Sequence, residues 1–415
     1  MMTSVLLCVV LLIIDMAIVL RYRENYVRAV ILLSCVYLIS LTIAQEMDLT
    51  FTVYFVFLFL VLLDQSKGVS KLLLCYGIYM VLYAVYGMIF QETMNTASVL
   101  ITRYGFLLLA LLQIDMRLPK SFRPVSDLLF ALRMGTATEI ILSIYLFFFG
   151  DLEGRLTMNH HAIGGSLSVG LVVLCIVLYF YDQNLWQEHF LWLYLLVNVA
   201  IILLSGTRGY YAMAGLTLIP FAGCFLMDRR HYRFRWMAAA VLGFLLCGLM
   251  LFAFDPIWEY VVSVLRLDES VGYRVYENDF IKSLYSVEPW YHKLFGFGLG
   301  GRADHLPETL GIAWQASQGN QWMAEKLLTE TTCHNYWYTV LFKQGILGLF
   351  FVVIILFTVF RRTFCRQSET GLRNSALFFG VGILISLTYR ISSTCGVFEM
   401  MVFIWSAEIV TKEES

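Results

Sequence analysis

The stretch TTCHNYWYTVLFKQGILGLFFVVIILF, residues 331–357, decides the fold class of this protein. From residue 335 to residue 360 the chain is mostly apolar. A helix needs about 20 mostly apolar residues to cross a bilayer, with a range of about 17 to 25. This run reaches that length, so it predicts a transmembrane helix.

Windows of the same kind recur along the whole chain and predict an all-α polytopic membrane protein with about 12–13 transmembrane helices. The windows are 3–20, 27–44, 49–63, 72–90, 97–114, 127–149, 162–181, 190–204, 210–227, 236–254, 335–360, 374–391 and 395–410. Three of them, 49–63, 190–204 and 395–410, are short. Twelve and thirteen spans therefore both remain open.

The composition excludes a water-soluble enzyme. The chain of 415 residues is 60% hydrophobic and 14% charged, whereas a soluble domain averages about 45–50% apolar and about 25% charged residues. The formal net charge is −1, so nothing global indicates a nucleic-acid partner. None of the nine cysteines belongs to a CxxC pair or a Cys/His cluster, so the sequence predicts no structural metal and no disulfide framework.

Lysine and arginine are distributed unevenly over the short loops, with seventeen on one side of the membrane and three on the other. Because cytoplasmic loops collect these residues, the N-terminus is predicted outside and the C-terminus inside. The same rule places residues 255–333 outside, as one large extracytoplasmic loop before the last spans. The chain then divides into about ten N-terminal spans (1–254), this loop (255–333) and the C-terminal spans (334–415).

The large loop is the only soluble mass in the sequence, 79 residues with an excess of acidic over basic side chains. It is too small for an independent domain but large enough to cap a cavity in the membrane. Apolar spacing predicts short amphipathic helices around 257–264 and 273–284, and a third from about 308 to 330. The Gly-rich segment 295–301 follows no βα unit, so it is interpreted as a turn and not as a nucleotide loop.

The outer-side arginines are candidates to bind an anion. Arg208 lies in SGTRG between two spans, where it either holds a phosphate in a bidentate fork or extends to the lipid headgroups. Arg274 lies in VGYRVYENDF, and an ion pair with Glu277 on the same helix is its alternative interpretation. Arg155 and Arg390 either extend a basic pocket or anchor the chain at the membrane interface.

His334 lies where the large loop enters the window 335–360, next to Asn335. A histidine at the membrane surface can act as a general base near neutral pH and take a proton from a sugar hydroxyl. Asn335 can orient the sugar or the imidazole, and a helix cap is the alternative interpretation of this pair. Glu139 lies deep in the window 127–149, where an acidic side chain needs a partner.

These features together resemble one known family, the O-antigen ligase and Wzy-type polysaccharide polymerase superfamily of bacterial envelopes. The resemblance rests on the order and spacing of motifs across roughly residues 200–350, and the many-span layout fits the remainder. The motifs are SGTRGYYAMAGL at 205–216, YRVYENDFIKSL at 273–284, PWYHKLFGFGLGG at 289–301 and CHNYWYTVLFKQGILGLF at 333–350.

The resemblance implies a GT-C-like glycosyltransferase that inverts the anomeric centre of a polyprenyl-diphosphate-linked glycan and needs neither a metal nor another cofactor. Arg208 and Arg274 resemble the arginines that hold the donor diphosphate, and His334 resembles the histidine that assists attack by the acceptor hydroxyl. The supporting candidates are Asn335, Arg155 and Arg390. The implied location is the bacterial cytoplasmic (inner) membrane, multi-pass, with the active site on the extracytoplasmic side.

The expected partners are the lipid bilayer, the lipid-linked donor and a glycan acceptor, with a flippase or a chain-length regulator as further candidates and no nucleic acid. The leading hypothesis is a polymerase that joins repeat units into capsule, exopolysaccharide or O-antigen. A ligase that transfers the finished glycan to lipid A core or a protein is the alternative within the family, and the sequence does not separate the two.

Two further hypotheses assume neither a polymerase nor a ligase of this family. One is a transporter for the same lipid-linked glycan, although the sequence has no clear internal repeat or midplane polar site. The other is a metal-dependent glycosyltransferase, for which only Glu46 and Asp48 offer acidic residues in an early outer loop.

Overall fold

The computed structural model describes residues 2–44, 47–65, 70–90, 123–150, 157–158, 162–163, 165, 167–205, 208–227, 267–298, 309–329, 335–366 and 402. Within these ranges the chain is helical, apart from one antiparallel pair of two-residue strands, β1 (Thr157–Met158) and β2 (Ala162–Ile163). The predicted all-α class is therefore confirmed for this part of the chain. The helices are α1 (Met2–Arg21), α2 (Tyr26–Ala44), α3 (Met47–Gln65), α4 (Lys71–Phe90), α7 (Pro124–Phe149), α8 (Ser168–Tyr181), α9 (Leu185–Glu188), α10 (Leu191–Leu204), α11 (Arg208–Met227), α14 (Leu267–Val287), α15 (Trp290–Phe295), α16 (Thr309–Ala316), α17 (Gln321–Thr329) and α18 (Tyr336–Arg366).

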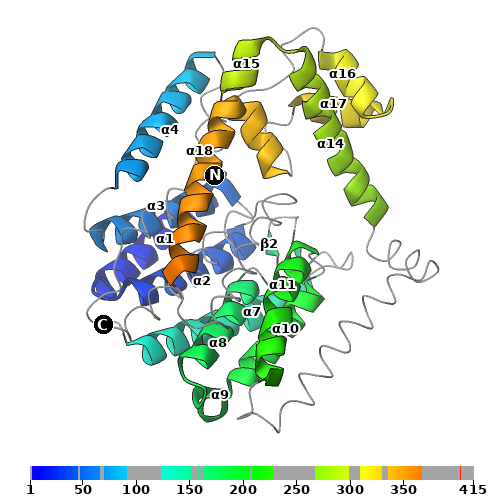
Figure 1. Cartoon of the computed structure of the whole chain (residues 1–415). Helices are drawn as coiled ribbons and strands as arrows, with labels where there is room; N and C mark the ends of the chain where they lie inside the picture. The colour runs from blue at the N-terminus through cyan, green and yellow to red at the C-terminus, as the bar shows by residue number, and fades with distance from the viewer. Residues whose placement is uncertain are drawn as a thin grey trace, which may run out of the picture.

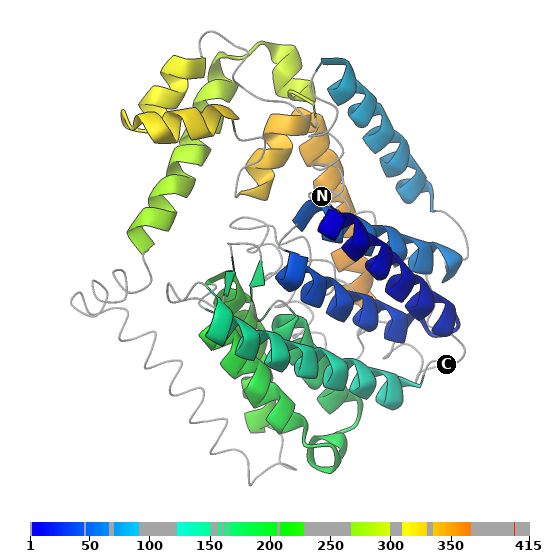
Figure 2. The ribbon, with the colours of Figure 1, turned by 180° about the vertical axis from the view of Figure 1, so that it is seen from behind.

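The helices form two groups that α18 connects (Figures 1 and 2). In the first group α1 and α3 contact α2, α2 contacts α7, and α8 contacts α7, α10 and α11. In the second group α14–α17 gather with the first part of α18 at the opposite end of the molecule (Figure 1). The remainder of α18 runs back to the first group, where Val352, Ile355 and Val359 join its hydrophobic core.

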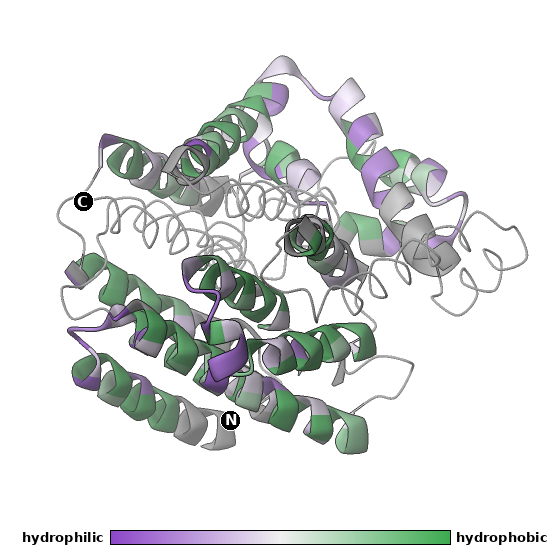
Figure 3. Cartoon of the chain, turned by 60° about the horizontal axis from the view of Figure 1, so that its bottom comes forward, coloured by the Kyte–Doolittle hydropathy of each residue, from purple (hydrophilic) through white to green (hydrophobic). Residues whose placement is uncertain are grey.

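Two helices in the described ranges contain segments long and apolar enough to cross a membrane, Val125–Phe149 of α7 and Tyr336–Arg361 of α18. Shorter apolar segments are Tyr26–Thr42, Thr52–Asp64, Lys71–Tyr86, Ser168–Tyr181, Leu191–Leu204 and Met213–Gly223. Apolar residues run along the helices, whereas hydrophilic residues gather in the connections and in the group formed by α14–α17 (Figure 3).

Large apolar side chains also cover the outward faces of these helices. The exposed fraction is 64% for Ile13 and Ile141, 63% for Val81 and Phe357, and 69% for Phe148. Extended apolar surface is unfavourable in water, whereas it matches the hydrocarbon chains of a bilayer. The outward faces and the two long apolar helices together indicate membrane association.

The predicted windows within the described ranges coincide with helices, with two differences. The window 335–360 is interrupted at Gly345, whose φ of 62° and ψ of −161° are not helical. The window 162–181 is helical only from Ser168, because residues 162–163 pair with 157–158 and Gly165 has a φ of 87°. The windows 97–114, 236–254, 374–391 and, apart from residue 402, 395–410 lie outside the described residues. The number of spans therefore stays a prediction.

Glu139, the deep acidic residue of α7, has its hydrogen-bond partners in the backbone. Its carboxylate is fully buried and accepts the N–H groups of Gly165 at 2.8 Å and Leu167 at 2.5 Å. Leu167 is the N-cap of α8 and forms no side-chain cap hydrogen bond of its own. A carboxylate at the positive end of α8 replaces that cap, and the predicted need for a partner is confirmed.

Asp127 forms a second buried acidic centre, in the first turn of α7, with an exposed fraction of 1%. Its Oδ1 accepts a hydrogen bond from Nε of Arg28 at 2.7 Å. Its Oδ2 accepts from Nδ2 of Asn25 and from the backbone N–H of Arg123, each at 2.8 Å. One carboxylate therefore joins the turn between α1 and α2 to the start of α7.

We expect Asp127→Ala to lower the free energy of unfolding by about 3 kcal/mol, because Arg28 and two further donors lose their acceptor in a buried site. The measurement is the unfolding transition of the detergent-solubilised protein, followed by intrinsic fluorescence. The control is Asp64→Ala, since the Asp64–Arg23 side chains are 46% and 70% exposed and such pairs contribute about 0–1 kcal/mol. Equal destabilisation by both substitutions would contradict a structural role for the Asp127 centre.

Candidate functional site

The helices of the predicted outer loop pack around a small hydrophobic core of their own. Its buried members are Phe280, Ile281, Leu284, Phe297, Ala313, Ala324, Leu327 and Phe342. They come from α14, the turn after α15, α16, α17 and the first part of α18. We call the unit formed by α14–α17 and residues 296–298 the cap.

The helix predicted for residues 273–284 is confirmed, because α14 spans them and buries Phe280 and Leu284. The prediction of one helix from 308 to 330 is wrong. Gln318 and Gly319 have φ values of 54° and 80°, so α16 ends before them and α17 begins after them. The helix predicted around 257–264 lies outside the described residues.

Polar contacts hold α14 against α15. The hydroxyl of Tyr285 donates a hydrogen bond to the carbonyl oxygen of Lys293. Partial burial raises the pKa of Tyr285, so the hydroxyl keeps the proton that this bond requires. The carboxylate of Glu288 lies 2.6 Å from Nδ1 of His292. The first contact joins α14 to α15, and the second joins the turn between them to α15.

The Gly-rich turn after α15 binds α18 at a break in that helix. Gly345 departs from helical geometry, with φ 62° and ψ −161°, so the first segment of α18 ends before it. The N–H of Phe297 donates to the carbonyl of Phe342, and the N–H of Gly298 donates to the carbonyl of Lys343, both at 2.9 Å. The turn thus satisfies carbonyl groups that the interrupted helix leaves without their usual partners.

Helix α4 adds side-chain hydrogen bonds to the same junction. The hydroxyl of Tyr83 lies 2.9 Å from the carbonyl oxygen of Phe295 and 3.3 Å from that of Gln344. The side chain of Gln344 is fully buried, and it accepts from the hydroxyl of Tyr79 at 3.4 Å. The junction therefore joins α4, the cap and α18.

Two glycines permit the backbone of the turn after α15 to lie close to the backbone of α18. A Cβ on Gly296 would lie 2.5 Å from the carbonyl carbon of Lys343, and one on Gly345 would lie 2.4 Å from the carbonyl oxygen of Leu294. Both glycines also have positive φ, 71° and 62°. Because the N–H groups of the turn are used by α18, the geometry agrees with its interpretation as a structural turn.

Three predicted site residues lie on described elements. Arg208 is the first residue of α11, Arg274 lies in α14, and Asn335 immediately precedes α18. The side chains of Arg208 and Arg274 lie outside the description. Also outside the described residues are His334, Arg155 and Arg390. The meeting of the two arginines with the histidine therefore stays a prediction.

Asn335 caps α18. Its side-chain oxygen accepts the N–H of Trp337 at 3.0 Å, and its carbonyl accepts the N–H and the hydroxyl of Thr339 at 3.0 and 3.2 Å. These N-cap hydrogen bonds fix the start of α18 at Tyr336. The role of Asn335 toward a sugar stays a prediction.

One buried cation was not predicted from the sequence. Lys343 is fully buried in the first segment of α18, two residues before Gly345, and its Nζ lies 5.1 Å from the centroid of the Phe342 ring. The C-terminal end of a helical segment favours a positive charge. The sequence contained a sign of this burial, because Lys343 lies inside the apolar window 335–360 and a lysine there usually has a functional or structural partner.

The cap exposes large aromatic side chains. The exposed fraction is 71% for Trp290, 63% for Trp322 and 49% for Trp314. Such faces can stack on sugar rings or lie at a membrane interface. Tyr336 differs, because it is fully buried in the core that α18 shares with the other helices.

Among the residues that the structure describes, no group of three or more His, Cys, Asp or Glu side chains is placed to hold a metal ion. No protein-family model matches the chain, and no curated protein matches it either. The resemblance to the polymerase and ligase superfamily rests on the sequence motifs alone.

We expect Gly296→Ala to detach the Gly-rich turn from α18 and to lower the free energy of unfolding by about 3 kcal/mol, because the added Cβ overlaps the α18 backbone. Limited proteolysis should then cleave the cap faster, and the unfolding temperature should fall. The matched control is Gly311→Ala in α16, where a Cβ would meet nothing within 4 Å. Unchanged proteolysis of the Gly296 variant would show that the cap does not depend on this junction.

Proposed function

We propose that the chain is a glycosyltransferase of the bacterial inner membrane that polymerises polyprenyl-diphosphate-linked oligosaccharide repeat units. In this proposal it crosses the membrane about 12–13 times in a GT-C-like arrangement, with residues 255–333 on the extracytoplasmic side. One observation carries the proposal. The helix that contains Arg274 and the segment of α18 that follows His334 contact each other and share one hydrophobic core, through Phe280 and Phe342.

The chemistry that follows requires few groups. Arg208 and Arg274 bind the diphosphate of the donor and neutralise its charge, so that the lipid diphosphate becomes a good leaving group. His334 accepts the proton of the acceptor hydroxyl as that oxygen attacks the anomeric carbon. The bond between this carbon and the phosphate oxygen breaks with inversion, and the lipid diphosphate departs. Two guanidinium groups supply the positive charge for which other enzymes use a metal ion.

A ligase remains the alternative within the same chemistry, because it differs only in the acceptor. A transporter is the second candidate class, and the break in α18 favours it, since transporters contain interrupted helices near the bilayer midplane. The break lies nine residues after the start of α18 and is bound by the cap. The break is therefore closer to the start of α18 than to its end. A position there fits an enzyme site at the outer face better than a transport site at the midplane.

The first test is a reaction of purified protein with a synthetic polyprenyl-diphosphate oligosaccharide in the presence of a chelator. We expect a ladder of longer lipid-linked glycans, formed at least about 100-fold more slowly by Arg208→Ala, Arg274→Ala and His334→Ala. The control is Arg23→Ala, since this exposed arginine lies in the turn after α1. Wild-type rates in the three variants would contradict the site assignment.

The remaining outcomes separate the alternatives. Product formed only after addition of a lipid A core or a protein acceptor would identify a ligase. Reaction only with a divalent metal ion would exclude the metal-independent mechanism. Transport of intact donor across proteoliposomes by the His334→Ala protein would favour the transporter.

A second test concerns topology. In a cysteine-free variant, Ser283→Cys in α14 should react with a membrane-impermeant maleimide added to spheroplasts, because the lysine and arginine distribution predicts residues 255–333 on the outer side. Asn184→Cys, between α8 and α9, should react only after permeabilisation. Both side chains are exposed. The reverse labelling pattern would contradict the proposed orientation.

A further inference from the structure

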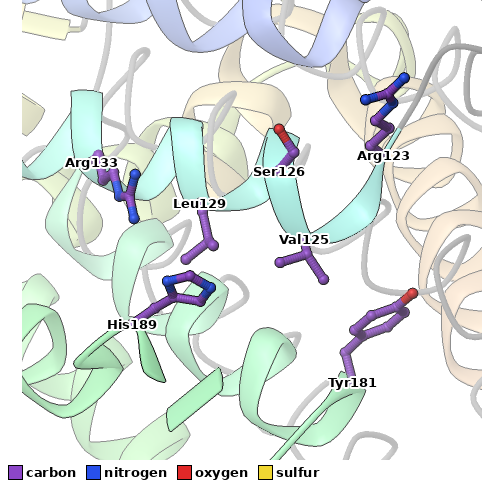
Figure 4. A pocket seen from close by; sticks show the side chains of 7 residues that line it. All are labelled: Arg123, Val125, Ser126, Leu129, Arg133, Tyr181 and His189. Atoms are coloured by element: carbon purple, nitrogen blue, oxygen red, sulfur yellow. The ribbon is translucent and has the colours of Figure 1, made fainter. Parts of the chain in front are cut away.

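A pocket of about 630 Å³ lies along the first part of α7, near α9 (Figure 4). This end of the molecule is opposite the cap (Figure 1). The residues that line the pocket are Arg123, Val125, Ser126, Leu129, Arg133, Tyr181 and His189.

One face of α7 forms a wall of the pocket. Val125, Leu129 and Arg133 follow each other at intervals of four residues and point toward His189 and Tyr181 (Figure 4). The side chain of Leu129 is buried, those of Tyr181 and His189 are half-buried, and that of Arg133 is exposed. The pocket therefore combines an apolar floor with polar groups from three separate parts of the chain.

The lining is positively charged, because it contains Arg123 and Arg133 and none of the lining residues is acidic. His189 adds a ring nitrogen that can donate a hydrogen bond. Within the described part of the chain, neither guanidinium group forms an ion pair or a hydrogen bond. Other arginines of the same part differ, because Arg28 lies 2.7 Å from Asp127 and Arg23 lies 3.2 Å from Asp64. Two arginines that have no partner among the described residues, together with a histidine, favour an anionic ligand.

Exposed apolar side chains follow His189 along the chain. Phe190, which follows His189, is 58% exposed, and Leu193 in the first turn of α10 is 47% exposed. Basic groups next to exposed apolar side chains match a ligand with a phosphate head and hydrocarbon chains. Basic pockets between membrane helices bind such headgroups on the cytoplasmic side. The orientation derived from lysine and arginine places this end of α7 on that side.

We propose that this pocket binds a phosphate group, with Arg133 and His189 donating hydrogen bonds to its oxygens and Tyr181 closing the pocket. The apolar surroundings favour the headgroup of an anionic phospholipid over free phosphate as its source. The site is independent of the proposed glycosyl transfer, because it lies at the opposite end of the molecule and shares none of the outer-side residues.

The test is native mass spectrometry of the full chain, released from detergent after incubation with phosphatidylglycerol or with zwitterionic phosphatidylcholine. We expect Arg133→Gln to reduce bound phosphatidylglycerol about tenfold, the usual effect of losing a charge-assisted hydrogen bond. Bound phosphatidylcholine should not change. The matched control is Arg23→Gln, which removes the same charge from an exposed arginine outside the pocket.

A second experiment distinguishes a phospholipid headgroup from a soluble phosphate compound as the ligand of the pocket. The wild type and both variants are heated with inorganic phosphate or with chloride at equal ionic strength, and unfolding is followed by fluorescence. Protection by inorganic phosphate that Arg133→Gln abolishes, without selective binding of phosphatidylglycerol, would assign the pocket to a soluble phosphate compound. If Arg133→Gln does not fold, His189→Gln replaces it. Equal phosphatidylglycerol binding and equal phosphate protection in all proteins would overturn the proposal.

Discussion

The hydrogen-bonding requirement of backbone groups that are removed from water organises the junction between the cap and α18. At the break in α18 the carbonyls of Phe342 and Lys343 lack the next turn of their helix, and the N–H groups of Phe297 and Gly298 take its place. These hydrogen bonds form only because the glycines at 296 and 345 let the backbone of the turn after α15 contact the backbone of α18. The position of the cap, and with it the position of α14, follows from this junction.

The same requirement shapes the bundle at two positions along α7, one in its first turn and one in its middle. Glu139 supplies the acceptor that the start of α8 lacks, and Asp127 supplies one for Arg28, Asn25 and the start of α7. A buried carboxylate is stable only when donors surround it, so each one specifies the segments that must meet there. Apolar packing, by contrast, tolerates many arrangements of similar helices.

The two ends of the molecule present different chemistry. The cap contains a small core and exposed tryptophans, and it positions the helix of Arg274 against the start of α18. The opposite end contains a pocket with two arginines, a histidine and an apolar floor. The pocket end offers the positive charge of Arg123 and Arg133, whereas the charge and the histidine proposed for the cap end rest on the sequence motifs.

Local sequence determined most of the described helices, because apolar runs of sufficient length, such as 127–149, and the spacing of Phe280 and Leu284 specify helical faces without any distant partner. It also marked Glu139 as a residue in need of a partner. It did not predict the separation of α16 from α17, the strand pair before α8 or the burial of Lys343. The strand pair and the turn between α16 and α17 are local, but they depend on backbone conformations that apolar spacing does not report. The break in α18 beside Lys343 is bound by a distant segment, because the N–H of Phe297 donates to the carbonyl of Phe342, and no local pattern encodes that pairing. The tertiary structure alone decided this junction, because the backbone groups at a helix break can be satisfied by any segment that fits.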